Sequence, residues 1–216
     1  MKLRLLIIVI ISILANYLFS NAFTITRLQY DGGGDWYSDP SSIPNLLEFA
    51  SSETGIKIQE EIETKIGEPA FYDNSYYYIT GHGDIKFNPA DRDRLRDVLL
   101  NGAFLHVDDN YGMDKTFRKA MEDMFPDKEW VELPPSHTIF NIFYQFPNGI
   151  PKIHEHDGNR PQALALFHDE KIIVLYTYES DLGDGWENRN VHNHSIKTHN
   201  EALKMGTNII IYYLTH

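Results

Sequence analysis

The chain has 216 residues, no cysteine, 42% hydrophobic residues and a net charge of −12 at pH 7. Its length suits one domain, and its composition is that of a globular protein and not of a disordered one. The absence of cysteine excludes disulfides and any thiol nucleophile. Nucleic acid and anionic lipid are not expected as partners, because both reward lysine and arginine.

The N-terminal segment differs from the rest of the chain. A basic start at Lys2 and Arg4 precedes an apolar run over residues 5–15, and residues 20–22 have the small-x-small pattern of a cleavage site. This pattern predicts a secretory signal peptide over residues 1–22. The alternative is an uncleaved signal anchor, although the apolar run is short for a bilayer span. Either reading predicts export to the periplasm or envelope of a bacterium, with membrane contact only through an uncleaved N-terminal segment.

Residues 23–216 are predicted to form a single α/β domain that begins with alternating strands and helices. The runs with strand character are 23–30, 76–80 and 103–107. Polar loops separate them from helices that are expected to begin near Ser42, at a cap on Asn88, and at a cap on Asp114. This order is typical of a parallel sheet with crossover helices. We therefore expect a three-layer α/β/α sandwich with a mostly parallel sheet.

The second half of the domain is predicted to be less regular at first. Residues 132–158 are rich in proline and aromatic side chains and are expected to be irregular. A hairpin is expected over residues 163–167 and 172–178. The pattern Thr198-x-x-Glu201 predicts a capping box for the last helix, whose apolar end indicates burial.

Four of the predicted strands end in loops rich in aspartate, glycine or histidine. In open α/β sheets ligands bind outside the carboxyl ends of the strands, where loop amides and helix N-termini meet. We therefore predict a site at this edge, with Asp108, Asp109 and His82 as catalytic candidates. The candidate ligand-binding residues from these loops are Asp31, Gly32, Gly33, Gly34, Asp35, Trp36, Gly81, Gly83, Asn110, Asp181, Asp184 and Trp186. The alternative is ordinary turn chemistry, although turns require neither paired acids nor histidine.

These residue types suggest several roles. Asp108 or Asp109 could bind a cation, act as a base or act as a nucleophile, or one could cap the loop while the other is solvated. The amides of residues 32–34 could hold an oxyanion. Trp36 and Trp186 lie beside carboxylates, where aromatic faces can hold a sugar or simply cover the core.

Two histidine pairs suggest a metal site. His154-x-His156 and His192-x-His194 each place two imidazoles on the same side of an extended segment, and His82 or the Asp108–Asp109 pair could approach them. We name His154 and His156 as candidate ligands of a divalent metal, and the sequence indicates no cofactor beyond this candidate metal. The alternative is that these histidines are solvated or ion-paired.

Several longer stretches resemble one bacterial family. They are YDGGGDWYSDPSSIPNLLEF, YITGHG, LRDVLLNGAFLHVDDNYG, FRKAMEDMFPD, YQFPNGIPKIHEH and SDLGDGWEN. In this order they closely resemble the family called domain of unknown function 4159, over nearly all of residues 23–216. The resemblance implies a flavodoxin-like sandwich related to class I glutamine amidotransferases, in a family with no settled activity.

The resemblance also limits the chemistry. In the amidotransferase fold the nucleophile is a cysteine in a strand-to-helix turn, and residues 107–110 are its counterpart here. Because the chain has no cysteine, amidotransfer through a thioester is excluded. A trehalose-utilisation-like branch of that fold also lacks the thiol, so a sugar-related role is conceivable. Membrane-anchored relatives suggest an interaction module of the envelope.

Two functions remain open from the sequence. The first is a module that binds a small molecule or an envelope protein through an Asp/His/Gly site without turnover. The second is an Asp/His-dependent hydrolase or lyase, which could use a metal and act on a small or carbohydrate-like substrate. We favour binding slightly, because no established catalytic motif is present.

Overall fold

In a computed structural model, which describes residues 22–156 and 158–216, one sheet has the strand order β2-β1-β3-β4-β7-β6-β5. The parallel strands are β1 (Thr26–Gln29), β2 (Ile62–Lys65), β3 (Tyr76–Ile79), β4 (Phe104–Asp108) and β7 (Lys171–Tyr178). The antiparallel strands are β5 (Val131–Glu132) and β6 (Gln162–His168). The mostly parallel sheet is confirmed. The predicted signal segment lies outside the described residues, apart from Ala22.

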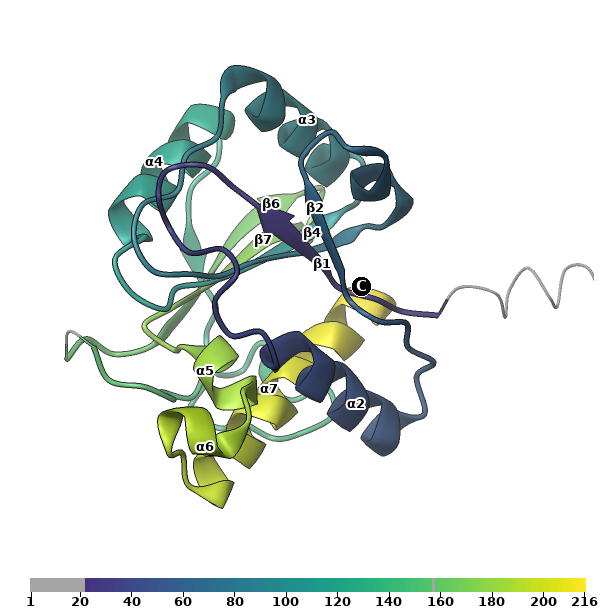
Figure 1. Cartoon of the computed structure of the whole chain (residues 1–216), viewed down its shortest axis with the longest axis vertical. Helices are drawn as coiled ribbons and strands as arrows, with labels where there is room; N and C mark the ends of the chain where they lie inside the picture. Colours follow the sequence, from purple (N-terminus) through teal and green to yellow (C-terminus); the bar gives the residue numbers. More distant parts are fainter. Residues whose placement is uncertain (1–21, 157) are drawn as a thin grey trace, which may run out of the picture.

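Helices cover both faces of this sheet (Figure 1). On one side lie α2 (Ser42–Thr54), α5 (Leu182–Trp186), α6 (Arg189–His192) and α7 (Ile196–Thr215). On the other side lie α3 (Pro89–Leu100) and α4 (Asp114–Met124). Two short 3₁₀ helices, η1 (Pro69–Asp73) and η2 (Thr138–Phe140), occur in the connections. The arrangement is the expected three-layer sandwich. In the described ranges, no helix is both long enough and apolar enough to cross a membrane.

The central strand β3 is buried on both faces. Tyr76 and Tyr78 belong to the core cluster under α2 and α7, whereas Tyr77 and Ile79 belong to the cluster under α3 and α4. Successive side chains of a strand point to opposite faces, so a strand covered on both sides needs apolar side chains at every position. The continuous run predicted as a buried strand is therefore confirmed.

Local signals correctly predict the starts of α2 and α3 and place the start of α4 to within one residue. Asn88 caps α3, its side chain accepting a hydrogen bond from the Asp91 amide at 3.0 Å. Asp114 is not the cap of α4 but its first residue.

The predicted capping box of the last helix is wrong. The cap of α7 is Ser195, whose hydroxyl accepts from the Thr198 amide at 3.0 Å. Ser195 has the extended backbone that an N-cap requires, so the helix begins three residues earlier than Thr198 would place its cap.

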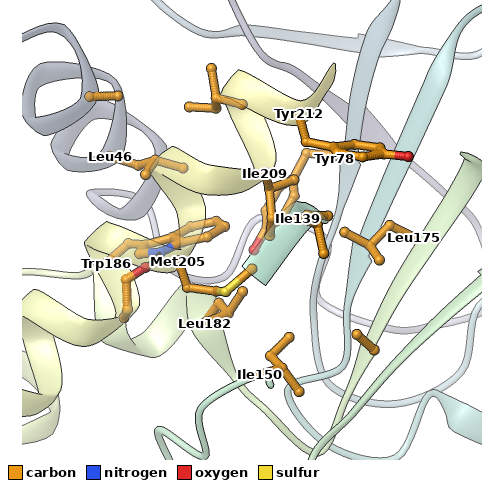
Figure 2. Packing of buried hydrophobic residues seen from close by; sticks show 14 of the residues in the cluster. Leu46, Tyr78, Ile139, Ile150, Leu175, Leu182, Trp186, Met205, Ile209 and Tyr212 are labelled. Carbon is orange, nitrogen blue, oxygen red and sulfur yellow. Dashed lines mark hydrogen bonds between the residues drawn. The ribbon is translucent and has the colours of Figure 1, made fainter. Parts of the chain in front are cut away.

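Helix α7 is buried because α5 packs directly against it. Trp186 lies fully buried beside Leu46 and Met205, and its indole nitrogen donates to the Ala202 carbonyl at 2.8 Å (Figure 2). A Cβ at Gly206 would lie 2.9 Å from the indole ring, so only glycine permits this close contact. The indole of Trp186, predicted as a ligand contact, is instead part of the core.

Candidate metal centre

The four loops predicted to form a site lie at one edge of the sheet. They follow β1, β3, β4 and β7, which are consecutive and parallel in the sheet order. The chain leaves β1 for β2 on one side and later for β3 on the other, so the carboxyl ends of β1 and β3 lie at a switch point of the topology. This part of the prediction is confirmed.

Arg27 holds the loop that follows β1. Although it is buried on a strand, its guanidinium donates to the carbonyls of Ser38 at 2.5 Å and Asp39 at 3.1 Å. It also pairs with Glu61 at 3.5 Å. Asp39, with φ at 55°, is thereby fixed in a left-handed conformation. Neither Arg27 nor Asp39 was singled out from the sequence, although Asp39 belongs to the same glycine-rich loop.

The glycines of this loop are required by contact with the loop after β3. A Cβ on Gly32 would lie 2.6 Å from the Asp84 carbonyl oxygen, and one on Gly34 would lie 2.8 Å from the His82 carbonyl oxygen. The Gly34 amide already donates to the Asp84 carbonyl at 3.0 Å. Close packing of two loops therefore accounts for these glycines, and the Gly34 amide is not free to hold an oxyanion.

Other predicted ligand residues of these two loops also make loop contacts. Asp31 is exposed, and its carbonyl accepts from the Lys86 amide at 2.6 Å. The Gly83 amide donates to the Tyr111 carbonyl at 2.9 Å. Gly33 is exposed. Gly81 has a φ of 136°, and a Cβ there would collide with the Tyr30 hydroxyl. Trp36 packs against the core under α3 and α4.

Asp108 braces the turn that carries two further aspartates. One carboxylate oxygen accepts from the Thr177 hydroxyl, and the other accepts from the Gly183 amide at 2.7 Å. Because the single hydroxyl proton of Thr177 goes to Asp108, Thr177 accepts from Nε2 of His106 at 3.1 Å. Burial raises the pKa of Asp108 to about 7 and lowers the pKa of His106 to about 3. Asp108 thus positions the start of α5.

Asp109 faces the opposite side of the sheet. It accepts from the Tyr176 hydroxyl at 2.9 Å, and that hydroxyl also approaches Asp114 at 3.1 Å. Burial raises the pKa of Asp109 to about 6. The two neighbouring acids predicted as catalytic are therefore separated by the sheet.

Asp109→Asn is expected to stabilise the metal-free protein at high pH. The folded state raises the pKa of Asp109 from 3.8 to about 6, so it favours the neutral form, and the cost of ionisation grows as pH rises through this window. We expect the variant to match the wild type near pH 4 and to be more stable by about 2–3 kcal/mol at pH 8. Urea unfolding in chelator at both pH values measures this difference. The exposed Asp127→Asn is the control; equal effects of both changes would contradict the assignment.

A cluster of aspartates and histidines lies at the turn that Asp108 holds in place. His154 Nδ1 is 2.6 Å from Asp184 Oδ2, and His156 Nε2 is 2.7 Å from Asp181 Oδ2. His192 approaches the same Asp184 oxygen at 3.1 Å. Three groups of potential ligand atoms lie within 4.8 Å of one another: His154 with Asp184 and His194, His154 with His156 and Asp181, and Asp39 with Asp184 and His192.

The carboxylates of this cluster are buried and incompletely paired. Asp39, Asp181 and Asp184 are almost inaccessible to solvent, and one oxygen each of Asp181 and Asp184 has no hydrogen-bond partner. Within the described residues, the ion-pair partners of these carboxylates are histidines. Burial is the main reason that the pKa of Asp39 is raised to about 6 and that the pKa of Asp181 is raised well above its usual range. Buried acids without a fixed cation are costly, so the cluster favours a bound cation.

The imidazoles of the cluster suit a transition metal. Burial lowers the pKa of His156 and His194, which favours the neutral form that coordinates metals. Nε2 of both His192 and His194 is buried without a hydrogen-bond partner, and Nε2 of His192 lies 3.8 Å from Asp39 Oδ1. Nitrogen and carboxylate ligands together are typical of zinc, and of other first-row divalent ions.

An aromatic residue and a His–Asp pair border the cluster. Tyr111, 49% exposed, stacks on His156 with ring centroids 5.2 Å apart. Its backbone pairs with that of His82, whose Nδ1 lies 3.2 Å from Asp35 Oδ2. The side chain of His82 is half-exposed, so a ligand at the rim of the cluster can reach its ring.

The structure thus regroups the predicted site residues. It brings His154, His156, Asp181 and Asp184 together, and it adds the pair His192 and His194 and the unforeseen Asp39. Asn110 supports the cluster, because its amide donates to Asp39 at 2.7 Å. His82 and Asp35 lie beside it, whereas Asp31 and Asp109 make contacts elsewhere.

The comparisons with known proteins identify the family of the chain. No curated protein matches the chain. A family model described as "Domain of unknown function (DUF4159)" matches residues 24–214. The match covers nearly the whole of the described chain, so the protein belongs to the DUF4159 family.

Proposed function

We propose that this protein is an exported hydrolase that depends on a divalent transition-metal ion held by its Asp/His cluster. The observation that carries the proposal is the meeting of buried, partly unpaired carboxylates with imidazoles from separate segments of the chain. Export is supported by the signal-like pattern of residues 1–22. A distant relation to the amidotransferase fold fits the sandwich architecture, with the chemistry moved from a cysteine to the metal cluster.

The cluster has the features that metal-assisted hydrolysis requires. A bound zinc ion with three protein ligands keeps a position for water and lowers the pKa of that water to about 7. The cluster's histidines are partly exposed, so a substrate can approach from solvent, while the aspartates behind them are buried. Asp108 accepts from the Gly183 amide next to Asp184, and Asn110 donates to Asp39. Both residues would thus orient the ligand carboxylates, as the outer hydrogen-bond partners of metal ligands do. The exposed ring of Tyr111 offers an apolar face for a small or carbohydrate-like substrate.

His82 is proposed as the proton-transfer group at the rim. Asp35 accepts from its backbone amide and lies beside its Nδ1, which orients the ring. His82→Gln is expected to lower kcat by about 100-fold or more while leaving the bound metal unchanged, because removing a general acid or base costs factors of this size. Metal content and steady-state rates, measured on one preparation, test this. A parallel loss of metal would make His82 a ligand instead.

The proposed function is tested by metal removal and reconstitution. Purified protein is stripped with chelator, reloaded with Zn²⁺, Mn²⁺ or Co²⁺, and assayed on nitrophenyl esters, phosphoesters and glycosides. We expect turnover that requires metal and disappears in His154→Gln. His168→Gln is the matched control, because His168 is the last residue of β6, beside the β6–β7 turn at the opposite edge of the sheet, and the variant should retain activity.

A binding module is the second candidate, favoured by the stacked and exposed Tyr111. It predicts that metal raises the melting temperature without turnover of any substrate class. A protein that binds no metal, and whose stability is unaffected by chelator, would contradict the metal-dependent proposal outright.

A further inference from the structure

We propose that the cluster holds two divalent metal ions that share the carboxylate of Asp184. The inference rests on the proposed function, because it assumes that the Asp/His cluster binds metal. It extends that function by assigning a second ion, with its own ligands, and a bridging group. The chemical class of the ligand is a pair of first-row divalent ions such as Zn²⁺ or Mn²⁺.

The number of ligands is the first argument. The described part of the chain offers seven ligand side chains in this cluster: Asp39, His154, His156, Asp181, Asp184, His192 and His194. A catalytic zinc ion takes about three protein ligands and one water. Seven ligands exceed what one ion can use, whereas two ions of three ligands each leave one ligand to spare.

The grouping of these ligands is the second argument. One group contains His154, His156 and Asp181, and another contains Asp39, Asp184 and His192. The two groups have no member in common, so each could hold an ion independently. A third possible group, completed by His194, takes His154 from the first and Asp184 from the second. The two sites are therefore adjacent and not separate.

The geometry of Asp184 is the third argument. Its Oδ2 lies 2.6 Å from His154 of the first group and 3.1 Å from His192 of the second. Its Oδ1 is buried and has no hydrogen-bond partner. One oxygen of Asp184 thus lies between the two groups, and the other makes no hydrogen bond. Such a carboxylate can place one oxygen on each ion.

Charge balance is the fourth argument. The three ligand carboxylates contribute three negative charges in a buried setting, and one divalent ion would leave part of this charge uncompensated. Two divalent ions with a bound hydroxide match the total charge. Paired ions about 3.5–4 Å apart are also the arrangement that stabilises both attacking and leaving oxygens in hydrolysis.

The test is the stoichiometry and magnetic coupling of bound Mn²⁺. The metal-depleted protein is loaded with Mn²⁺, freed of excess metal, and measured by elemental analysis and by electron paramagnetic resonance. We expect two ions per chain with an exchange-coupled spectrum. His156→Gln and His192→Gln, each of which disrupts one group, are expected to retain one uncoupled ion, and the control His168→Gln is expected to retain two coupled ions.

The outcomes separate this inference from the proposed function. One ion per wild-type chain would overturn the two-ion centre and leave the metal-dependent hydrolase intact. Two ions without coupling would overturn the shared carboxylate. No bound metal in the wild type would overturn both. Because the decisive measurement is on the wild type, a variant that fails to fold does not affect the conclusion.

Discussion

Asp184→Asn is expected to abolish turnover and to reduce metal-dependent stabilisation sharply. Asp184 belongs to two of the three possible ligand groups, and it lies buried between His154 and His192. For the wild type, metal at 1,000 times its Kd should add about 4 kcal/mol to the free energy of unfolding. For the variant we expect a clearly smaller gain, because the group of His154, His156 and Asp181 keeps its ligands whereas the amide cannot supply the charged bridge to a second ion.

The same variant should behave oppositely without metal. In chelator the wild type retains a buried, partly unpaired carboxylate, which the amide replaces with a neutral group of the same shape. Asp184→Asn should therefore melt at the same temperature as the metal-free wild type or higher. Asp169→Asn, in the exposed β6–β7 turn, is the matched control and should respond to metal as the wild type does. A normal metal response in Asp184→Asn would remove Asp184 from the centre.

Trp186→Ala is expected to cost about 3–5 kcal/mol of stability. The indole is fully buried between α2 and α7 and donates to the Ala202 carbonyl, so truncation leaves a large cavity (Figure 2). Typical domains have only about 5–15 kcal/mol in total, so the variant should unfold at much lower urea concentration. Metal affinity should also fall, because Trp186 ends the short helix that begins immediately after Asp181 and contains Asp184.

Two further variants test whether the loss of stability in Trp186→Ala comes from the buried indole. Trp186→Phe keeps most of the buried volume and should cost about 1–2 kcal/mol, from the lost hydrogen bond and a smaller void. Tyr37→Ala removes an exposed aromatic side chain and should change stability by less than about 0.5 kcal/mol. If Trp186→Ala proved no more costly than Tyr37→Ala, Trp186 would not be the link between core and site.

Local patterns were sufficient to predict the architecture. The buried run of β3, the Asn88–Pro89 start of α3 and the glycine-rich strand ends depend on side-chain periodicity and backbone conformation within a few residues. Such signals identify a parallel sheet and the edge where its loops meet. The DUF4159 family was recognisable from the sequence as well, since several of the stretches that resemble it include the strand-end loops.

Local patterns could not assign different roles to neighbouring residues of the same chemistry. Asp108 and Asp109 have the same chemistry and adjacent positions, but consecutive side chains at a strand end point to opposite faces. Asp108 braces α5, whereas Asp109 pairs with Tyr176 on the other side of the sheet. The sheet's order and its packing against α4 and α5 determine this division.

The sequence by itself determined the three-layer sandwich, the edge where its loops meet and the candidate histidine pair His154 and His156. Only the tertiary structure decided that these histidines meet Asp39 and the turn carrying Asp181 and Asp184. The physical reason is distance along the chain: the ligands come from four segments between residues 39 and 194, and no local preference encodes their approach. Buried contacts that do not involve the ligand atoms themselves, such as Trp186 against Gly206 and the Arg27 guanidinium on the Asp39 carbonyl, hold those segments together.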